Sequence, residues 1–239
     1  MTNQLCDPEC PICAGVGFVR YNVPMADERF GKMQICPKRV KHLQRTLGAG
    51  GLYPDEVQEL SWNMVQEGIN EGHVAKAAVE QIYQQGYGIA FLYGGFGQAK
   101  TLLLKIGVAV ALREGRTAAY ANMGDILEDL KQSFDEQNSS RELSRRMHKW
   151  LSMDLLSIDE LDKVNQTEWA RSVIHKLLDH RYTRAVREEA ITLVAANLGG
   201  GIDSLDGYLA SRLRDNRVGR LVELDGPDGR RVMPKGYRY

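Results

Sequence analysis

Residues 91–104, FLYGGFGQAKTLLL, constrain the fold of this chain more than any other segment. An apolar run enters the segment, a glycine-rich turn follows, and Lys100 and Thr101 begin a leucine-rich run with helical spacing. This order is typical of a phosphate-binding loop, because backbone N–H groups close around phosphate oxygens and the helix N-terminus adds positive potential. We expect Lys100 to reach the β- and γ-phosphates of a nucleotide and the Thr101 hydroxyl to bind magnesium. The residues predicted to form the binding loop are Gly94, Gly95, Phe96, Gly97, Gln98, Ala99, Lys100, Thr101 and Leu102.

One residue departs from the common pattern of such loops, G-x-x-x-x-G-K-[ST]. The pattern begins correctly at Gly94, but Ala99 occupies the position of the second glycine. A methyl group there crowds the loop without abolishing it. We therefore predict that Ala99→Gly strengthens nucleotide binding or turnover modestly, because it relieves a methyl group near the phosphates.

A second motif, MDLLSIDE at residues 153–160, reads as an apolar strand that ends in paired acids. This is the Walker B arrangement, in which Asp159 holds magnesium through water and Glu160 polarises the attacking water. A further apolar strand, residues 190–196, ends at Asn197, a polar residue that we expect beside the γ-phosphate. Together the motifs predict an ATPase that binds ATP and magnesium.

All four cysteines lie within the first 36 residues. Two of them form a C-x-x-C followed by glycines, the tight geometry that aims two thiolates at one zinc ion. The surrounding segment has few large apolar residues, so a metal would supply the stability that its core cannot. We predict an all-cysteine zinc site, with His42 as the competitor of Cys6 for the fourth position. The predicted ligands are Cys6, Cys10, Cys13 and Cys36.

The chain divides into a zinc-binding module at residues 1–45, a glycine-rich linker at residues 46–53 and an ATPase domain at residues 54–239. In the domain, helical and strand-like segments alternate, which predicts a parallel α/β sheet with the nucleotide at the carboxyl ends of the strands. Expected helices span 54–85, 100–113, 123–134, 141–151, 166–182 and 203–213; expected strands span 89–93, 117–121, 153–160, 190–196 and 219–224.

The charge and hydropathy of the chain bear on its partners and on its cellular location. The formal net charge is +0, so bulk basicity does not indicate nucleic-acid binding. No apolar run approaches the length of a membrane span, and the N-terminus lacks a basic region followed by an apolar one. We expect a cytoplasmic protein that has no membrane partner.

With these motifs in hand, the chain resembles the DnaC/IstB group of AAA+ ATPases over almost its whole length, and especially the phage-type replicative helicase loaders. The N-terminal CPICAGVGFVRYNVP is similar to the zinc-binding leader of that group. The leader often ends C-x-C, and Lys38 stands here in place of the last cysteine, which favours Cys6 as the fourth ligand. The other matching segments are LYGGFGQAKT, LLSIDELDKV, EWARSVIHKLLDHRY, ITLVAANL, YLASRLRD and VELDGPDGRR.

The resemblance implies an AAA+ fold and roles for several polar residues. It implies that Asn197 is the sensor 1 residue and that Arg212 is the arginine finger, with Arg214 or Arg217 as the next candidates. It also implies that sensor 2 is Arg230, with Arg231 as the alternative. A finger supplied to the neighbouring subunit would make a lone subunit a poor ATPase.

The resemblance further implies a function in the initiation of DNA replication. A loader would be an ATP-dependent oligomer that engages single-stranded DNA and a hexameric replicative helicase. One alternative is a transposition helper ATPase of the IstB type, against which the zinc leader argues. Another is a weakly hydrolysing nucleotide-switch adaptor, which Ala99 favours and the Asp159–Glu160 pair opposes.

Overall fold

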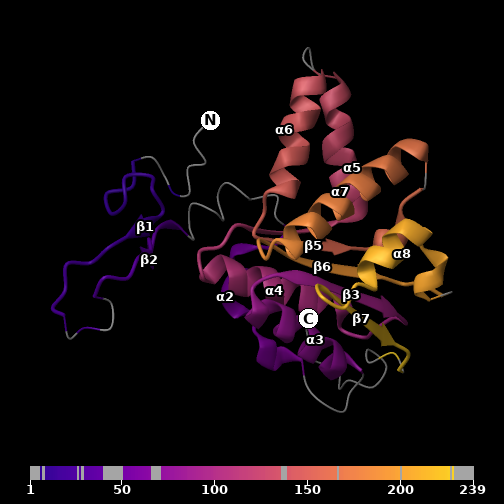
Figure 1. Cartoon of the computed structure of the whole chain (residues 1–239), viewed down its shortest axis with the longest axis horizontal. Coiled ribbons are helices and arrows are strands. Elements are labelled where there is room, and N and C mark those ends of the chain that lie inside the picture. Colours follow the sequence, from indigo (N-terminus) through magenta and orange to yellow (C-terminus); the bar gives the residue numbers. More distant parts are fainter. Residues whose placement is uncertain are drawn as a thin grey trace.

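The computed structural model describes residues 6, 9–25, 27, 30–39, 51–65, 71–135, 139–165, 167–199, 201–226 and 228. These residues form a short N-terminal hairpin unit and an α/β body (Figure 1). The sensor 2 candidates Arg230 and Arg231, and the alternative zinc ligand His42, lie outside the described residues. Within the described residues, no helix is both long and apolar enough to cross a membrane.

The body is built on a five-stranded sheet in the order β4-β5-β6-β3-β7, in which every pairing is parallel. Its strands read as apolar runs because helices cover both faces. The prediction of a parallel α/β sheet is therefore confirmed. The strands are β3 (Gly88–Gly94), β4 (Ala118–Asn122), β5 (Leu155–Asp159), β6 (Ile191–Ala196) and β7 (Gly219–Leu224).

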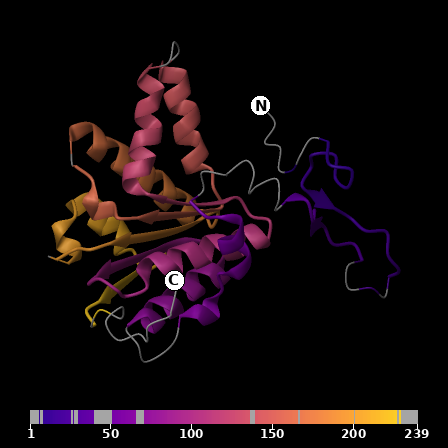
Figure 2. The same cartoon turned by 180° about the vertical axis from the view of Figure 1, so that it is seen from behind.

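Alternate residues of each strand enter two separate hydrophobic clusters, one on each face of the sheet. One face packs against α2 (Pro54–Glu59), α3 (Gly72–Gln85) and α4 (Lys100–Arg113), as Figure 2 shows from behind. The other packs against helices of the second half of the chain. These helices are α5 (Met123–Lys131), α6 (Ser139–Leu151), α7 (Glu168–Val186) and α8 (Gly207–Leu213). The described elements of the body also include four 3-10 helices: η1 (Trp62–Met64), η2 (Gln132–Asp135), η3 (Leu161–Lys163) and η4 (Ile202–Ser204).

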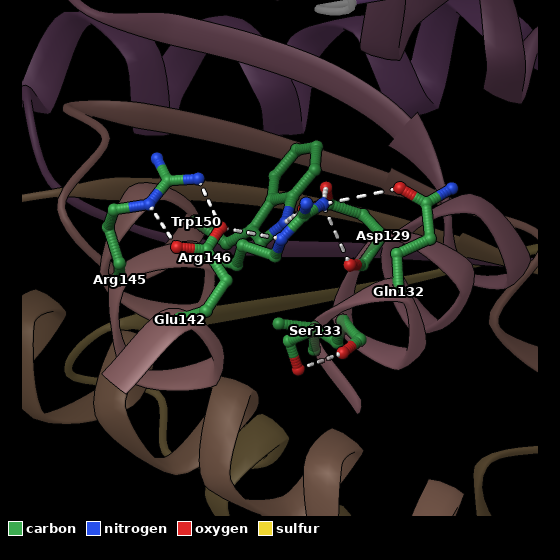
Figure 3. A network of polar contacts seen from close by, with 8 residues as sticks. Asp129, Gln132, Ser133, Glu142, Arg145, Arg146 and Trp150 are labelled. Atoms are coloured by element: carbon green, nitrogen blue, oxygen red, sulfur yellow. Dashed lines mark hydrogen bonds and ion pairs between the residues drawn. The ribbon is translucent and has the colours of Figure 1, made fainter. Parts of the chain in front are cut away.

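Helices α5 and α6 form a pair that projects from the body in both views (Figures 1 and 2). A polar network holds them together, with Arg146 at its centre (Figure 3). Its guanidinium donates to Asp129 Oδ1 at 2.7 Å and to Glu142 Oε1 at 2.9 Å, while the indole of Trp150 donates to Asp129 Oδ2 at 2.9 Å. The projecting pair is therefore fixed by partly buried charged contacts as well as by apolar packing.

The expectation of one helical region over residues 54–85 is wrong. Helix α2 ends at Glu59, because Leu60 and Ser61 are extended, and η1 follows before α3 begins at Gly72. The expected helix over 203–213 also begins later, at Gly207, where the Asp206 carboxylate accepts a hydrogen bond from Tyr208 N at 3.0 Å.

The N-terminal unit pairs β1 (Phe18–Val19) with β2 (Gln34–Ile35) in an antiparallel hairpin. The buried cluster of its described residues consists of the four cysteines, with Val19 packed against them. The segment predicted as a linker is described from Gly51 onward, and Leu52 packs against the α/β core. The last residues of that segment are thus in contact with the body.

Candidate nucleotide-binding site

The turn between β3 and α4 has the backbone conformation that its glycine-rich sequence predicts. Gly94 has φ 121°, and a Cβ atom there would lie 2.2 Å from the carbonyl oxygen of Leu224, so a side chain cannot be accommodated. Gly97 and Ala99 have φ 72° and 58°, both in the left-handed region. Ala99 therefore departs from the motif at a position where glycine is favoured by the backbone, and the departure costs conformational strain.

Lys100 begins α4 and is only 8% exposed. Its Nζ donates to the carbonyl oxygens of Gly94 at 2.9 Å and Gly95 at 2.6 Å. The ammonium group is therefore held against the loop that would enclose the phosphates.

The two motifs meet at Asp159, which ends β5 and is 5% exposed. Its Oδ2 atom accepts hydrogen bonds from Thr101 Oγ1 at 2.6 Å and from the Tyr120 hydroxyl at 2.9 Å. Its Oδ1 atom accepts from the backbone N–H of Glu160 at 2.8 Å. A hydroxyl oxygen and a carboxylate in contact are the kind of ligands that magnesium takes, so Thr101 and Asp159 fit a magnesium site.

Tyr120 was not predicted from the sequence, although its hydroxyl donates to Asp159. Burial raises the pKa of Tyr120, and the charge of Asp159 and the hydrogen bond to it raise the pKa further. The phenol therefore keeps its proton at neutral pH and acts as the donor to the carboxylate.

Glu160 has a left-handed backbone, with φ 53°, and its carboxylate forms an ion pair with Lys163. The contact with Glu160 raises the pKa of Lys163. Asn197 follows β6, and its backbone N–H donates to Asp162 Oδ1 at 2.8 Å. These groups occupy the same edge of the sheet as the glycine-rich loop, at the carboxyl ends of β5 and β6.

A cavity of about 500 Å³ joins the predicted residues. Its walls come from the glycine-rich loop, the ends of β5 and β6, and α2. Gly94 and Gly95 do not line the cavity. Their carbonyl oxygens accept hydrogen bonds from the Nζ atom of Lys100, which does line it. The predicted residues that line the cavity are Phe96, Gly97, Gln98, Ala99, Lys100, Thr101, Leu102, Asp159, Glu160 and Asn197.

Gln98 is almost fully buried and also braces the loop from behind. Its Nε2 donates to the carbonyl oxygen of Gly226 at 2.6 Å, and its Oε1 accepts from Glu71 N at 3.1 Å. The Glu71 carboxylate in turn accepts from Asp225 N at 2.7 Å. The loop is thereby tied to the start of α3 and to the chain that leaves β7.

Arg212 is on α8 and is not among the residues lining the cavity. Its Nε donates to Asp179 Oδ1 at 2.7 Å, and its guanidinium lies 3.8 Å from the centroid of the Tyr208 ring. Hydrogen bonds from Tyr208 and Arg212 lower the pKa of Asp179. The candidate finger is therefore ion-paired within its own chain and lies outside its own nucleotide cavity.

The two other arginines considered for this role are also ion-paired within the chain. Arg214 pairs with Asp203, and Arg217 pairs with Asp215 at 2.7 Å. Neither lines the cavity. These contacts do not distinguish among the three arginines. Arg212 therefore remains the candidate for the arginine finger because of the family resemblance alone.

The four cysteines form a second candidate site, in which all Sγ atoms lie within 4.8 Å of one another and all four residues are buried. The Sγ atoms of Cys10 and Cys36 are 3.7 Å apart. A tetrahedral zinc ion with Zn–S bonds of about 2.3 Å requires sulfur atoms separated by roughly 3.8 Å. The geometry therefore fits one zinc ion bound by four thiolates.

Hydrogen bonds within the cluster favour the thiolate form of Cys10, whereas burial and the neighbouring thiols of Cys13 and Cys10 raise the pKa of Cys36. Burial raises the pKa of Cys10, but the backbone N–H groups of Ile12 and Cys13 and the thiols of Cys13 and Cys36 lower it to about 6. Gly17 N donates to Cys13 Sγ at 3.3 Å. Such N–H donors stabilise the deprotonated form in which cysteine binds a metal.

The parallel sheet, the glycine-rich loop after β3 and the acidic residues after β5 are arranged as in the AAA+ fold. No protein-family model matches the chain, and no curated protein shows significant sequence similarity to it. Solved structures share its fold, and several of them are of proteins that initiate DNA replication.

Three of these structures illustrate the likeness. A replication initiator DnaA bound to AMPPCP and single-stranded DNA is 20% identical, with a TM-score of 0.58 over 72% of this chain and 50% of that chain. The structure of DnaI is 16% identical, with a TM-score of 0.54 over 74% of this chain and 94% of that chain. The structure of the DnaC helicase loader is 18% identical, with a TM-score of 0.51 over 71% of this chain and 98% of that chain.

The fraction of the matched structure that this chain covers is smaller for DnaA than for DnaI and DnaC. The chain spans about half the length of the DnaA structure but nearly all of the DnaI and DnaC structures. Identities this low establish a shared fold, and the AAA+ fold expected from the resemblance is confirmed.

Proposed function

We propose that this protein is an ATP-dependent replicative helicase loader that acts in the initiation of DNA replication. The observation that carries the proposal is the meeting of Lys100, Thr101, Asp159 and Glu160 at one cavity, in a fold shared with the DnaC helicase loader. The DnaC and DnaI structures are matched over nearly their whole length, which favours a loader over an initiator of the DnaA kind.

The chemistry proposed for the cavity is hydrolysis of ATP by in-line attack of water on the γ-phosphate. Lys100 exchanges its contacts with the carbonyl oxygens of Gly94 and Gly95 for phosphate oxygens. Thr101 and Asp159 would hold a magnesium ion. Glu160 leaves its ion pair with Lys163 and polarises the attacking water. When bound, magnesium would supply positive charge that offsets the negative charge of the β- and γ-phosphate groups.

The proposed loader self-associates in the ATP state, because its finger serves a neighbour. Arg212 lies outside the cavity of its own chain, so it can offset the developing charge on the γ-phosphate only in another subunit. We propose Asn197 as sensor 1 and Arg230 as sensor 2, as the resemblance implies.

We propose that the four cysteines bind zinc and that the N-terminal unit docks a hexameric helicase. The unit exposes apolar side chains that its small core cannot cover, among them Val16, Met25 and Met33, which are 61%, 82% and 72% exposed. Exposed apolar groups on a metal-stabilised hairpin are suited to bind a protein partner.

Single-stranded DNA is the second proposed partner. Helix α6 places Arg141 and Arg145 on one exposed face of the projecting α5–α6 pair, where Arg145 also pairs with Glu142. Basic side chains on a rigid projection can contact phosphates without bulk positive charge on the whole chain. DNA binding should accordingly weaken as salt is raised.

A nucleotide-switch adaptor is the second candidate function. It is favoured by the strained Ala99 in the binding loop and by the ion pair that Glu160 makes with Lys163. The adaptor would bind ATP and exchange partners but turn over slowly, even when DNA and helicase are present.

The experiment that tests the proposal measures ATP binding, ATP turnover and helicase capture with purified protein. Lys100→Ala should weaken ATP binding severely, because it removes the phosphate contact. Glu160→Gln should retain ATP but block turnover, because it removes the group that polarises water. Helicase should bind the wild-type protein in the presence of ATP.

The outcomes separate the hypotheses. Tight ATP binding by Lys100→Ala would refute the phosphate-binding role of the loop. Equal and minimal turnover of the wild type and Glu160→Gln in the presence of DNA and helicase would favour the adaptor. Capture of a transposase in place of a helicase would favour the transposition helper.

A further inference from the structure

The hydroxyl group of Tyr120 contacts Asp159, one of the residues that line the nucleotide cavity, although neither sequence motif contains Tyr120. The register of β4 and β5 pairs Tyr120 with Ser157, so Asp159, two residues further, points to the same face of the sheet. Helix α4 covers this face, where Ser157 Oγ donates to the carbonyl oxygen of Leu104 at 3.0 Å. Tyr120 and Asp159 are 9% and 5% exposed, so water is largely excluded from their contact.

The ring of Tyr120 is held from two sides. Gly51 lies so close that a Cβ atom on it would be 2.6 Å from a ring carbon, and Lys105 Nζ lies 5.4 Å from the ring centroid. The hydroxyl therefore has a fixed position. It is 2.9 Å from Asp159 Oδ2 and 3.3 Å from Asn122 Oδ1, so the carboxylate is the closer acceptor.

We propose that Tyr120 is a positioning residue for magnesium, because its hydroxyl fixes the Asp159 carboxylate beside the Thr101 hydroxyl. The inference rests on the proposed binding of ATP and magnesium. Both carboxylate oxygens are anchored, since Glu160 N donates to Oδ1 and Tyr120 donates to Oδ2. The Oδ2 atom also accepts from Thr101, the other proposed magnesium ligand, at 2.6 Å. The orientation of the carboxylate is thus set by the protein before an ion binds.

The test compares Tyr120→Phe with Tyr83→Phe. Tyr83 is a matched control, because its hydroxyl also donates to a carboxylate, Glu114 Oε2, at 2.6 Å, but at the far end of α4. Binding of a fluorescent ATP analogue is titrated in EDTA and at increasing magnesium concentrations. Tyr120→Phe should raise the magnesium concentration for half-maximal binding about tenfold and leave the affinity in EDTA unchanged. Tyr83→Phe should match the wild type in both conditions.

Each other outcome has a defined meaning. If Tyr120→Phe requires the same magnesium concentration as the wild type, the positioning role is wrong and the proposed function stands. If Tyr120→Phe loses affinity equally with and without magnesium, the residue acts on the fold, and the inference is also overturned. If the wild type binds no ATP in either condition, the proposed function itself fails.

Discussion

The substitution Ala99→Gly tests how the binding loop tolerates its departure from the motif. Ala99 has φ 58° and ψ 14°, a left-handed conformation that costs a residue with a Cβ atom about 1–2 kcal/mol. Glycine removes that cost but loses about 0.4–1 kcal/mol through the greater freedom of the unfolded chain. Glycine also lacks the half-buried methyl group, which packs at the edge of the apolar cluster around α4, and losing it costs roughly 0.4 kcal/mol more.

These contributions leave a net gain of about 0.5 kcal/mol for Ala99→Gly. The gain can be divided between folding and nucleotide binding. If the free loop keeps the left-handed conformation, the gain adds to the free energy of unfolding. If the free loop relaxes, it adds to ATP affinity, and an upper limit of about 1 kcal/mol corresponds to a roughly fivefold lower Kd.

The assay measures both quantities, by denaturant unfolding and by titration with a fluorescent ATP analogue. Glu188→Gly is the matched control, because Glu188 is exposed, has φ 61° and lies at the end of α7, away from the nucleotide cavity. It should stabilise the fold by about 0.5–1 kcal/mol and leave ATP affinity unchanged. The reasoning is refuted if Glu188→Gly stabilises while Ala99→Gly destabilises. It is also refuted if Ala99→Gly tightens ATP binding more than tenfold, since strain cannot supply that much.

Two further predictions concern the zinc cluster and the finger. Metal analysis should find about one zinc per chain, and Cys10→Ser should abolish zinc binding, unfold the leader and leave ATP binding intact; a leader that stays folded without metal would contradict the zinc site. Arg212→Ala should leave ATP binding by a lone subunit nearly unchanged but abolish stimulated hydrolysis. Mixing Arg212→Ala chains with Lys100→Ala chains should restore some turnover, because one keeps a complete cavity and the other keeps its finger; no restoration with both variants folded would show that the finger is misassigned.

Much of the fold could be predicted because its strongest signals are local. The bounds of α4 and β7 agree with the prediction, since glycines and apolar runs mark where these elements begin and end. The helix predicted before the loop, over residues 54–85, is interrupted. Val57, Leu60 and Met64 recur at helical spacing, yet Leu60 is extended and Met64 is 42% exposed. Periodicity alone does not detect a break when apolar residues on both sides of it keep the same spacing.

That the residues of the two motifs lie together at one cavity could be predicted, because the residues of each motif are adjacent in sequence and the carboxyl ends of parallel strands meet at one edge of a sheet. Tyr120 and Gln98 differ, since their roles depend on contacts with distant segments. That β4 lies beside β5, which brings Tyr120 to Asp159, follows from the strand order and cannot be read from spacing. The contact of Gln98 with Gly226 likewise depends on β7 lying next to β3.

The contacts that hold Asp159 are more deeply buried than the ion pairs of Glu160 and Arg212, and this difference bears on the proposed mechanism. Asp159 is 5% exposed and anchored through both oxygens, so it is suited to hold an ion in one position throughout a cycle. Glu160 pairs with Lys163, and Arg212 pairs with Asp179, through side chains that are 37%, 50%, 29% and 41% exposed. Exposed pairs contribute little to stability, so they can be broken at small cost. In the proposed mechanism, Glu160 leaves Lys163 to reach water and Arg212 leaves Asp179 to reach a neighbouring phosphate, so two of the contacts that must be exchanged are the more exposed ones. Lys100 differs, because it is 8% exposed and must exchange its contacts with the carbonyl oxygens of Gly94 and Gly95.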